Sequence, residues 1–210
     1  MFIVLEGIDG AGKGRQRIEL INKLKEKKPQ VSITSIEFPD HDGFLYKEII
    51  KPVLLEKKSV SKYSMFLAFA LDQSLFQEQI IRAKGSTKEH FICDGYFTTN
   101  LVYNCLLNKY FNLDEALTLA KTFGIIQPDI SIFIDVEPEI CLQRKKDELG
   151  HKMGLDIYER SIEKQKILRN AYKDMVKGKI FGNWLKINGN GDINDVSKKL
   201  YQILEINKFI

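Results

Sequence analysis

The feature that most constrains this chain is a glycine-rich segment that begins at residue 7. Residues 7–13 read Gly-Ile-Asp-Gly-Ala-Gly-Lys and fit the pattern GxxxxGK. The apolar run Phe2–Leu5 precedes this segment, and an amphipathic stretch to about Lys27 follows it. Between a strand and a helix, such glycines let backbone N–H groups converge on phosphate oxygens, and the helix N-terminus adds partial positive charge. The pattern therefore predicts a nucleotide-binding phosphate loop.

One position of this loop departs from the usual pattern. The residue after Lys13 is commonly a Ser or Thr whose hydroxyl binds Mg²⁺, and here it is Gly14. Arg15 follows, with two alternatives open: contact with a phosphate, or an exposed place on the helix. Lys13 itself would bridge the outer phosphates of ATP. The loop residues predicted to bind the nucleotide are Gly7, Gly10, Ala11, Gly12, Lys13, Gly14 and Arg15.

Apolar runs and amphipathic stretches alternate along the rest of the chain. Residues 31–38, 90–93, 130–136 and 184–187 read as further strands. Strands that alternate with helices at this spacing predict an α/β fold, with a parallel sheet and helices on both faces. No linker, repeat or low-complexity segment divides the chain, so one domain is expected over residues 1–210. The helical patterns cover residues 46–55, 62–84, 99–109, 113–123, a stretch from 138, residues 156–177 and the C-terminal segment.

Composition and charge argue against several classes of function. The 32 basic and 28 acidic side chains leave a net charge of +4, without an aromatic–basic stripe, so no nucleic-acid partner is expected. No apolar run approaches the roughly 20 residues of a membrane span, and the N-terminus has no basic leader. Cys93, Cys105 and Cys141 lack metal-type spacing. We therefore expect reduced thiols in a cytoplasmic protein without membrane attachment.

Several short segments of the chain match, in the same order, segments that are typical of one protein family. Residues 2–13 read FIVLEGIDGAGK. The others are EFPD at 37–40, FLAFALDQ at 66–73, ICDGY at 92–96, QPD at 127–129, DVEPE at 135–139 followed by Arg144, and DIYE at 156–159. Because these segments agree in order over nearly the whole chain, the sequence resembles the thymidylate kinases.

That resemblance implies both a fold and a reaction. The fold would be that of P-loop NTPases, with a five-stranded parallel sheet, helices on both faces and a lid at about residues 145–155. The reaction would transfer the γ-phosphoryl group of ATP to dTMP in the presence of Mg²⁺, giving dTDP and ADP. Two alternatives stay open: another (deoxy)nucleoside-monophosphate kinase, or a catalytically impaired nucleotide-binding protein of the same fold. A homodimer is also implied, because members of the family commonly pack helices face to face.

The resemblance also assigns roles on the ATP side. The adenine would lie near the turn that contains Asn190, and Asp9 would meet the sugar or the acceptor phosphate. Asp94, at the carboxyl end of a strand, would hold Mg²⁺ through water. Four cations at the lid would close over the phosphates, namely Arg144, Lys145, Lys146 and Lys152, although a lysine-rich loop is often only solvated. The implied catalytic residues are Lys13, Asp94, Arg144 and Lys152.

On the acceptor side, the resemblance implies recognition of a pyrimidine. Phe69 would stack on the base, with a core packing role as the alternative. Asn104 offers a donor and an acceptor for the edge of the base, with an exposed helix position as the alternative. The implied substrate-binding residues are Asp9, Phe38, Phe69, Gln73, Asp94, Thr99, Tyr103 and Asn104.

Three arginines that the family uses around the acceptor are absent from this chain. Their positions hold Asp40, Gln73 and Gly95. Charge-assisted hydrogen bonds contribute about 1.5–3 kcal/mol each, so losing all three would cost roughly 10³-fold or more in affinity or rate. Other cations are therefore expected to compensate. The candidates are Arg15, Lys47, Lys51 and Arg82.

Overall fold

The computed structural model describes residues 1–55, 57–149 and 161–210. Within these residues, five strands form one parallel sheet in the order β2-β3-β1-β4-β5, which confirms the predicted α/β fold. The strands are β1 (Phe2–Glu6), β2 (Ser32–Glu37), β3 (Glu89–Asp94), β4 (Ile130–Asp135) and β5 (Trp184–Asn188).

The three inner strands have apolar sequences because both of their faces are covered. All residues of β1 and β4 are buried, and so are those of β3 after Glu89. Strands buried on both faces lose the alternation of polar and apolar residues that a half-exposed strand shows. β2, at one edge of the sheet, is largely exposed, and its two isoleucines, Ile33 and Ile36, are half-buried.

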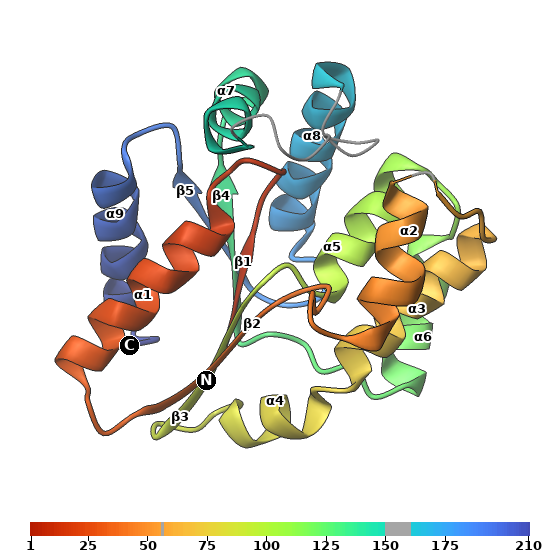
Figure 1. Cartoon of the computed structure of the whole chain (residues 1–210). Coiled ribbons are helices and arrows are strands. Elements are labelled where there is room, and N and C mark those ends of the chain that lie inside the picture. The colour runs from red at the N-terminus through yellow and green to blue at the C-terminus, as the bar shows by residue number, and fades with distance from the viewer. Residues whose placement is uncertain (56, 150–160) are drawn as a thin grey trace.

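Helices cover both faces of the sheet. Figure 1 shows α1 and α9 on one face and α5 and α3 on the other. Two segments, η1 and η2, are π-helical and continue directly into or from an α-helix. The helices are α1 (Lys13–Lys27), η1 (Tyr46–Ile50), α2 (Lys51–Leu54), α3 (Lys62–Ser74), α4 (Gln77–Ala83), α5 (Phe97–Leu101), η2 (Val102–Leu107), α6 (Leu113–Thr122), α7 (Pro138–Leu149), α8 (Ile162–Gly178) and α9 (Ile193–Ile206).

One expected helix was wrong in its extent. The single helix expected over residues 62–84 is interrupted between α3 and α4, where the Phe76 ring packs edge-on against Phe38 at 5.3 Å between centroids. The first residues of the expected lid, 145–149, are the last turn of α7. Residues 150–155, with Lys152, lie outside the described residues, as do residues 156–159 of the DIYE segment.

The parallel sheet brings the predicted site residues together. The carboxyl ends of β1, β3 and β4 lie side by side, because β1 pairs with both neighbours in register. Ligands of open α/β sheets bind at this edge. The three cysteines are buried and free of disulfides, as expected. Among the described helices, none combines the length and apolar character needed to cross a membrane.

Candidate active site

The phosphate loop joins β1 to α1 as predicted. Gly10 and Gly12 have positive φ angles of 82° and 90°, which glycine adopts readily. At Gly10 a Cβ atom would lie 2.5 Å from the carbonyl oxygen of Cys141, so the loop backbone packs directly against α7. The Nζ atom of Lys13 donates hydrogen bonds to the carbonyl oxygens of Gly7 (2.9 Å) and Ile8 (3.3 Å). The lysine ammonium is therefore held within the loop.

Arg144 connects the phosphate loop to the turn after β5. Its Nη2 atom donates to the carbonyl oxygens of Gly189 (2.9 Å) and Gly191 (3.0 Å), and its Nη1 atom lies 3.4 Å from that of Ala11. The Asn190 side chain accepts a hydrogen bond from the Glu137 backbone N–H at 2.9 Å. The structure thus brings Arg144, the loop and the predicted adenine-side turn together, with Asn190 holding the turn against the start of α7.

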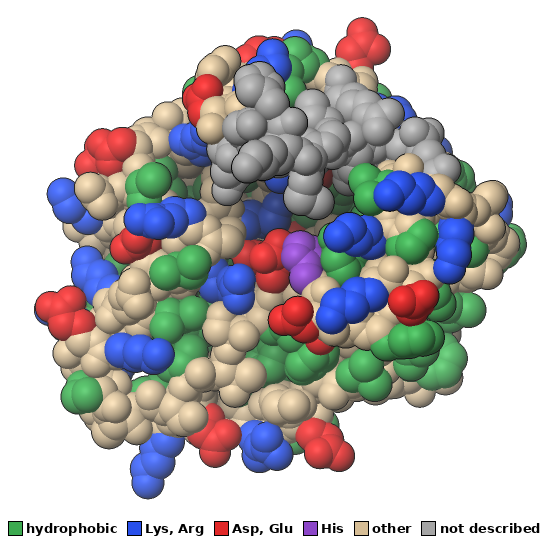
Figure 2. Space-filling model, in the orientation of Figure 1, with side chains coloured by type: hydrophobic (Ala, Val, Ile, Leu, Met, Phe, Trp, Pro, Cys, Tyr) green, Lys and Arg blue, Asp and Glu red, His purple; other side chains and the backbone are tan. Residues whose placement is uncertain are grey.

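Asp94 ends β3 and faces the start of α1. Its Oδ2 atom lies 3.3 Å from the place where a Cβ atom of Gly14 would stand, and 3.2 Å from the Nε atom of Arg17. Burial raises the pKa of Asp94 to about 6, and the nearby Glu37 adds to this, while Lys13 and Arg17 oppose it. Figure 2 shows acidic, basic and histidine side chains gathered in a hollow of the face between α1 and α2.

Arg17 was not predicted as a site residue. Its position in the sequence could have indicated this role. Arg17 lies four residues after Lys13, and residues four apart share a helix face. The four cations proposed as replacements for the missing arginines have other partners. Arg15 is 60% exposed and pairs with Glu19. Lys47 pairs with Asp42, and Arg82 pairs with Glu89. Lys51 lies over the Tyr46 ring. For Arg15, this geometry favours the exposed alternative.

Asp9 links the phosphate loop to η2. The Tyr103 hydroxyl donates a hydrogen bond to Asp9 Oδ2 at 2.9 Å, and Lys13 Nζ lies 3.7 Å from Asp9 Oδ1. Asn104, one residue further along η2, is buried, and its Nδ2 atom donates to Asn100 Oδ1 at 2.6 Å. The exposed alternative for Asn104 was therefore wrong. π-Helical segments are frequent at functional sites.

Glu6 is a buried carboxyl group immediately before the loop, and it too was not predicted. It accepts hydrogen bonds from the hydroxyls of Thr98 and Thr99, the latter at 2.8 Å. The Tyr172 hydroxyl of α8 in turn contacts Thr99 Oγ1 at 3.4 Å. Burial raises the pKa of Glu6 to about 7, although these hydroxyls and Lys13 act in the opposite direction. A charged residue at the end of an apolar strand was the sequence signal for this group.

The residues expected around the acceptor base lie on α3 and near it. Phe69 is half-buried, whereas Phe38 is 7% exposed and its ring contacts Phe76 and Tyr96. The side chain of Phe38 therefore belongs to the aromatic core. Gln73 is 2% exposed, and its Oε1 atom has no hydrogen-bond partner among the described residues. Such an acceptor is suited to a polar ligand group, because buried polar atoms are normally paired.

Arg169, on α8, fixes the carboxyl end of β4. Its Nε atom lies 2.5 Å from Asp135 Oδ1, and its other two nitrogens bind the Glu137 carboxylate. Lys186 also approaches Asp135, at 3.6 Å. This cluster attaches α8 to the strand next to the phosphate loop, and the sequence showed no sign of the pairing because its members are far apart along the chain.

Together, a parallel sheet, a phosphate loop between β1 and α1, and a lysine held in that loop define a P-loop nucleotide-binding protein. Comparison with known families narrows this class. The thymidylate kinase family matches residues 5–200. The chain therefore belongs to the thymidylate kinase family, whose members are phosphotransferases.

Individual relatives agree with this assignment. A thymidylate kinase of Caenorhabditis elegans is 26% identical over 212 residues, covering 98% of this chain and 90% of that protein. Thymidylate kinases of Mycoplasmopsis agalactiae and Chlorobium limicola are each 30% identical, and the alignments cover 84% of this chain and 81% and 82% of those proteins. The similarity is thus spread over the chain and does not stop at the phosphate loop.

Proposed function

We propose that the protein is a dTMP kinase that transfers the γ-phosphoryl group of ATP to dTMP and releases dTDP and ADP. The observation that carries this conclusion is the family match over residues 5–200, which includes the phosphate loop and the residues expected around the acceptor. The geometry supports it, since Lys13, Asp9 and Asp94 all lie around the loop. Phosphoryl transfer needs mainly positioning and neutralisation of charge, which such a site supplies.

On the ATP side, the loop N–H groups and Lys13 would hold the phosphates. Arg144 would add a second cation, because its guanidinium already lies against the loop and the turn after β5. The adenine would then lie near that turn. Lys13 would exchange its bonds to the loop carbonyls for bonds to phosphate oxygens, which bind an ammonium more strongly.

Mg²⁺ would be held by Asp94 through water. Mg²⁺ commonly uses one or two carboxylates, substrate phosphates and water, and the Asp94 carboxylate faces residue 14 of the loop, where glycine leaves room. No group of three or more His, Cys, Asp or Glu side chains in residues 1–55, 57–149 and 161–210 offers an all-protein cage. When bound, the ion would neutralise negative charge on the ATP phosphates.

On the acceptor side, the base of dTMP would lie between α3 and η2. Phe69 would contact the ring, and the unpaired Oε1 atom of Gln73 would receive a donor of the base or its surroundings. Tyr103 would act through Asp9, which it holds by a hydrogen bond of 2.9 Å. Thr99 would act in the same indirect way, because its hydroxyl is bound to Glu6.

A coupled ADP-release assay tests this function. ATP and Mg²⁺ would be supplied with dTMP, dUMP, UMP, CMP, AMP or GMP, one at a time. We expect turnover with dTMP well above that with the other acceptors. Preference for another monophosphate would reassign the acceptor. Absence of acceptor-dependent turnover, in protein that binds ATP, would contradict the kinase function and leave a nucleotide-binding protein.

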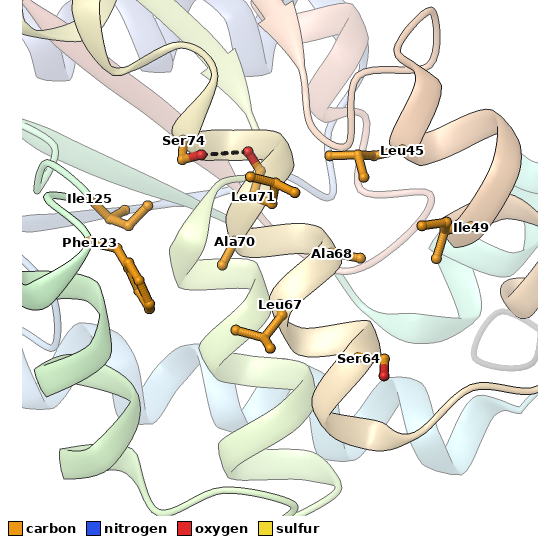
Figure 3. Close-up of a pocket in the computed structure, with 10 residues that line it drawn as sticks. All are labelled: Leu45, Ile49, Ser64, Leu67, Ala68, Ala70, Leu71, Ser74, Phe123 and Ile125. Atoms are coloured by element: carbon orange, nitrogen blue, oxygen red, sulfur yellow. Dashed lines mark hydrogen bonds between the residues drawn. The ribbon is translucent and has the colours of Figure 1, made fainter.

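We also propose that the enzyme is a homodimer that pairs through α3. An apolar groove of about 450 Å³ runs along this helix (Figure 3). Leu67, Leu71 and Phe123 border it and are 46%, 51% and 59% exposed. Between Lys62 and Asp72 the helix carries no charge, so two copies can meet face to face without repulsion. Exposed apolar surface of this kind typically marks an interaction site.

Replacing Leu71 with glutamate should convert the dimer to a monomer. Two glutamates would face each other across the twofold interface and oppose burial of the groove. Sedimentation equilibrium measures the mass directly, and Ile206→Glu serves as the control because Ile206 is 79% exposed at the end of α9. A wild-type protein that sediments as a monomer, or an L71E variant that still dimerises, would show that α3 is not the interface.

A cytoplasmic location is proposed on two grounds. The cysteines are free and buried, as is usual for proteins of a reducing compartment. The substrates that we propose, ATP and dTMP, are small intracellular nucleotides. Fractionation of the source cells, followed by detection of the native protein, would test this location.

A further inference from the structure

The three positions where the family has arginines around the acceptor hold Asp40, Gln73 and Gly95 in this chain, so none of them supplies a cation. Position 40 holds an aspartate in place of an arginine. Its backbone N–H donates to the Asp72 carboxylate at 3.0 Å, so two carboxylates lie near this position and no cation is supplied there. Gly95 has a φ angle of 65°, and a Cβ atom there would lie 3.0 Å from the carbonyl oxygen of Phe38. A long side chain at position 95 would therefore be strained. A phosphate dianion at this end of β3 needs a cation from another element.

Arg17 reaches this place from α1. Its side chain is only 15% exposed, so the guanidinium is enclosed by its neighbours. Its Nε atom lies 3.2 Å from Asp94 Oδ2, and its Nη1 atom donates to Ser35 Oγ at 2.9 Å. These two contacts place the guanidinium across the ends of β2 and β3. Gly95 directly follows Asp94, so Arg17 lies close to one of the lost arginine positions.

The third nitrogen of Arg17 is held only loosely. Nη2 lies 3.8 Å from Glu37 Oε2, which is beyond hydrogen-bond distance, and the Glu37 side chain is 47% exposed. Half-exposed ion pairs of this length contribute little, because water screens them. Incoming phosphate can therefore replace Glu37 as the partner of Nη2 while the other two nitrogens keep their partners. A guanidinium anchored in this way is preorganised for a second anion.

We propose that Arg17 binds the phosphate of the acceptor nucleotide through Nη2, in place of the arginines that this chain lacks. The proposal rests on the dTMP kinase function proposed above. With Nε on Asp94, the phosphate would lie beside residue 14, at the end of the loop where the γ-phosphoryl group is expected. A lysine could supply the charge, but one ammonium lacks the planar fork that reaches Asp94, Ser35 and a phosphate together.

Kinetics of Arg17→Ala and Arg17→Lys test the proposal. The alanine variant should raise the KM for dTMP by about 10- to 100-fold, the loss expected for a charge-assisted bond. The KM for ATP of the alanine variant should stay within about twofold of the wild-type value. The KM for dTMP of the lysine variant should lie between those of the wild type and the alanine variant. Thymidine lacks the phosphate, so its inhibition constant against dTMP should change by less than about twofold. Lys25→Ala, which removes an exposed cation from the same helix, is the matched control.

The thymidine measurement separates phosphate binding from a structural role. If Arg17→Ala weakens the binding of thymidine as much as that of dTMP, Arg17 only supports the fold and the proposal is overturned. The same holds if the KM for ATP rises as much as the KM for dTMP. An unchanged KM for dTMP would overturn it as well. Because Arg17 is largely enclosed and its replacement could disturb the fold, Glu37→Gln provides a second test. Removing the competing carboxylate should lower the KM for dTMP about two- to fivefold, and a raised KM would contradict the proposal.

Failure of the proposed kinase function can be distinguished from failure of the Arg17 proposal. If the wild-type protein shows no turnover with dTMP, the kinase function fails, and calorimetric titration with dTMP and thymidine still compares the wild type with Arg17→Ala. Selective loss of dTMP binding would support Arg17 as a phosphate-binding residue even then. Equal binding of dTMP by both proteins would overturn it.

Discussion

Replacing Lys13 with alanine should lower kcat/KM for dTMP-dependent ADP formation by on the order of 10³-fold, the cost of losing a main contact to the transferred group. The lysine ammonium lies inside the phosphate loop, where it contacts the carbonyl oxygens of Gly7 and Ile8. Without it, the site would lose the one ammonium group inside the phosphate loop, although the loop N–H groups, Arg144 and bound Mg²⁺ would still neutralise part of the charge on the phosphates. The coupled ADP-release assay measures the effect, with Lys25→Ala as the control for charge on α1.

The same variant should fold normally. Lys13 is 18% exposed, and its pair with Asp9 spans 3.7 Å, so the free energy of unfolding should change by less than about 1 kcal/mol. Chemical denaturation of both proteins would establish this. Activity within tenfold of wild type, in a variant of normal stability, would show that the loop is not the phosphate-binding site.

Replacing Glu6 with glutamine should raise the free energy of unfolding at pH 8, by up to about 3 kcal/mol, and by much less at pH 5. Burial raises the pKa of Glu6 from 4.5 to about 7 in the folded protein. Between these values the folded state binds more protons than the unfolded state, so stability falls as pH rises through this window and stays lower above it. Glutamine carries no charge at either pH and avoids this loss, which is 1.36 kcal/mol for each pKa unit.

Urea denaturation at pH 5 and pH 8 measures both values. Thr98 and Thr99 now donate to the Glu6 carboxylate, and their hydroxyls can accept hydrogen bonds from the glutamine amide. Glu115→Gln is the matched control, because Glu115 is exposed in the first turn of α6 and should show little dependence on pH. Equal destabilisation of E6Q at both pH values would mean that the threonines fully compensate the buried charge.

The sequence was sufficient to predict the sheet and the phosphate loop. Apolar runs at regular spacing identified strands that are covered on both faces, and GxxxxGK between a strand and a helix has one well-defined conformation. In the structure, Lys13 and Arg144 both lie beside the loop. The roles of these residues in catalysis stay predictions.

Contacts between distant segments could not be predicted in the same way. Glu6 meets Thr98 only because β1 pairs with β3, and Arg17 meets Asp94 because α1 packs over that pair. Such contacts depend on strand order and helix rotation, which a local pattern does not contain. The break between α3 and α4 was missed for a related reason, since the packing of Phe76 on Phe38 is a tertiary contact that overrides helix periodicity.

The close packing of Gly10 on Cys141 limits how this enzyme can be redesigned. A side chain at position 10 would collide with the α7 backbone, and the positive φ angle there disfavours any other residue. A new catalytic cation therefore cannot be added to the loop at this position unless α7 moves. Variants with altered rate should be sought on α1 and α7, which border the loop, and variants with altered acceptor preference on α3, where the base is proposed to lie.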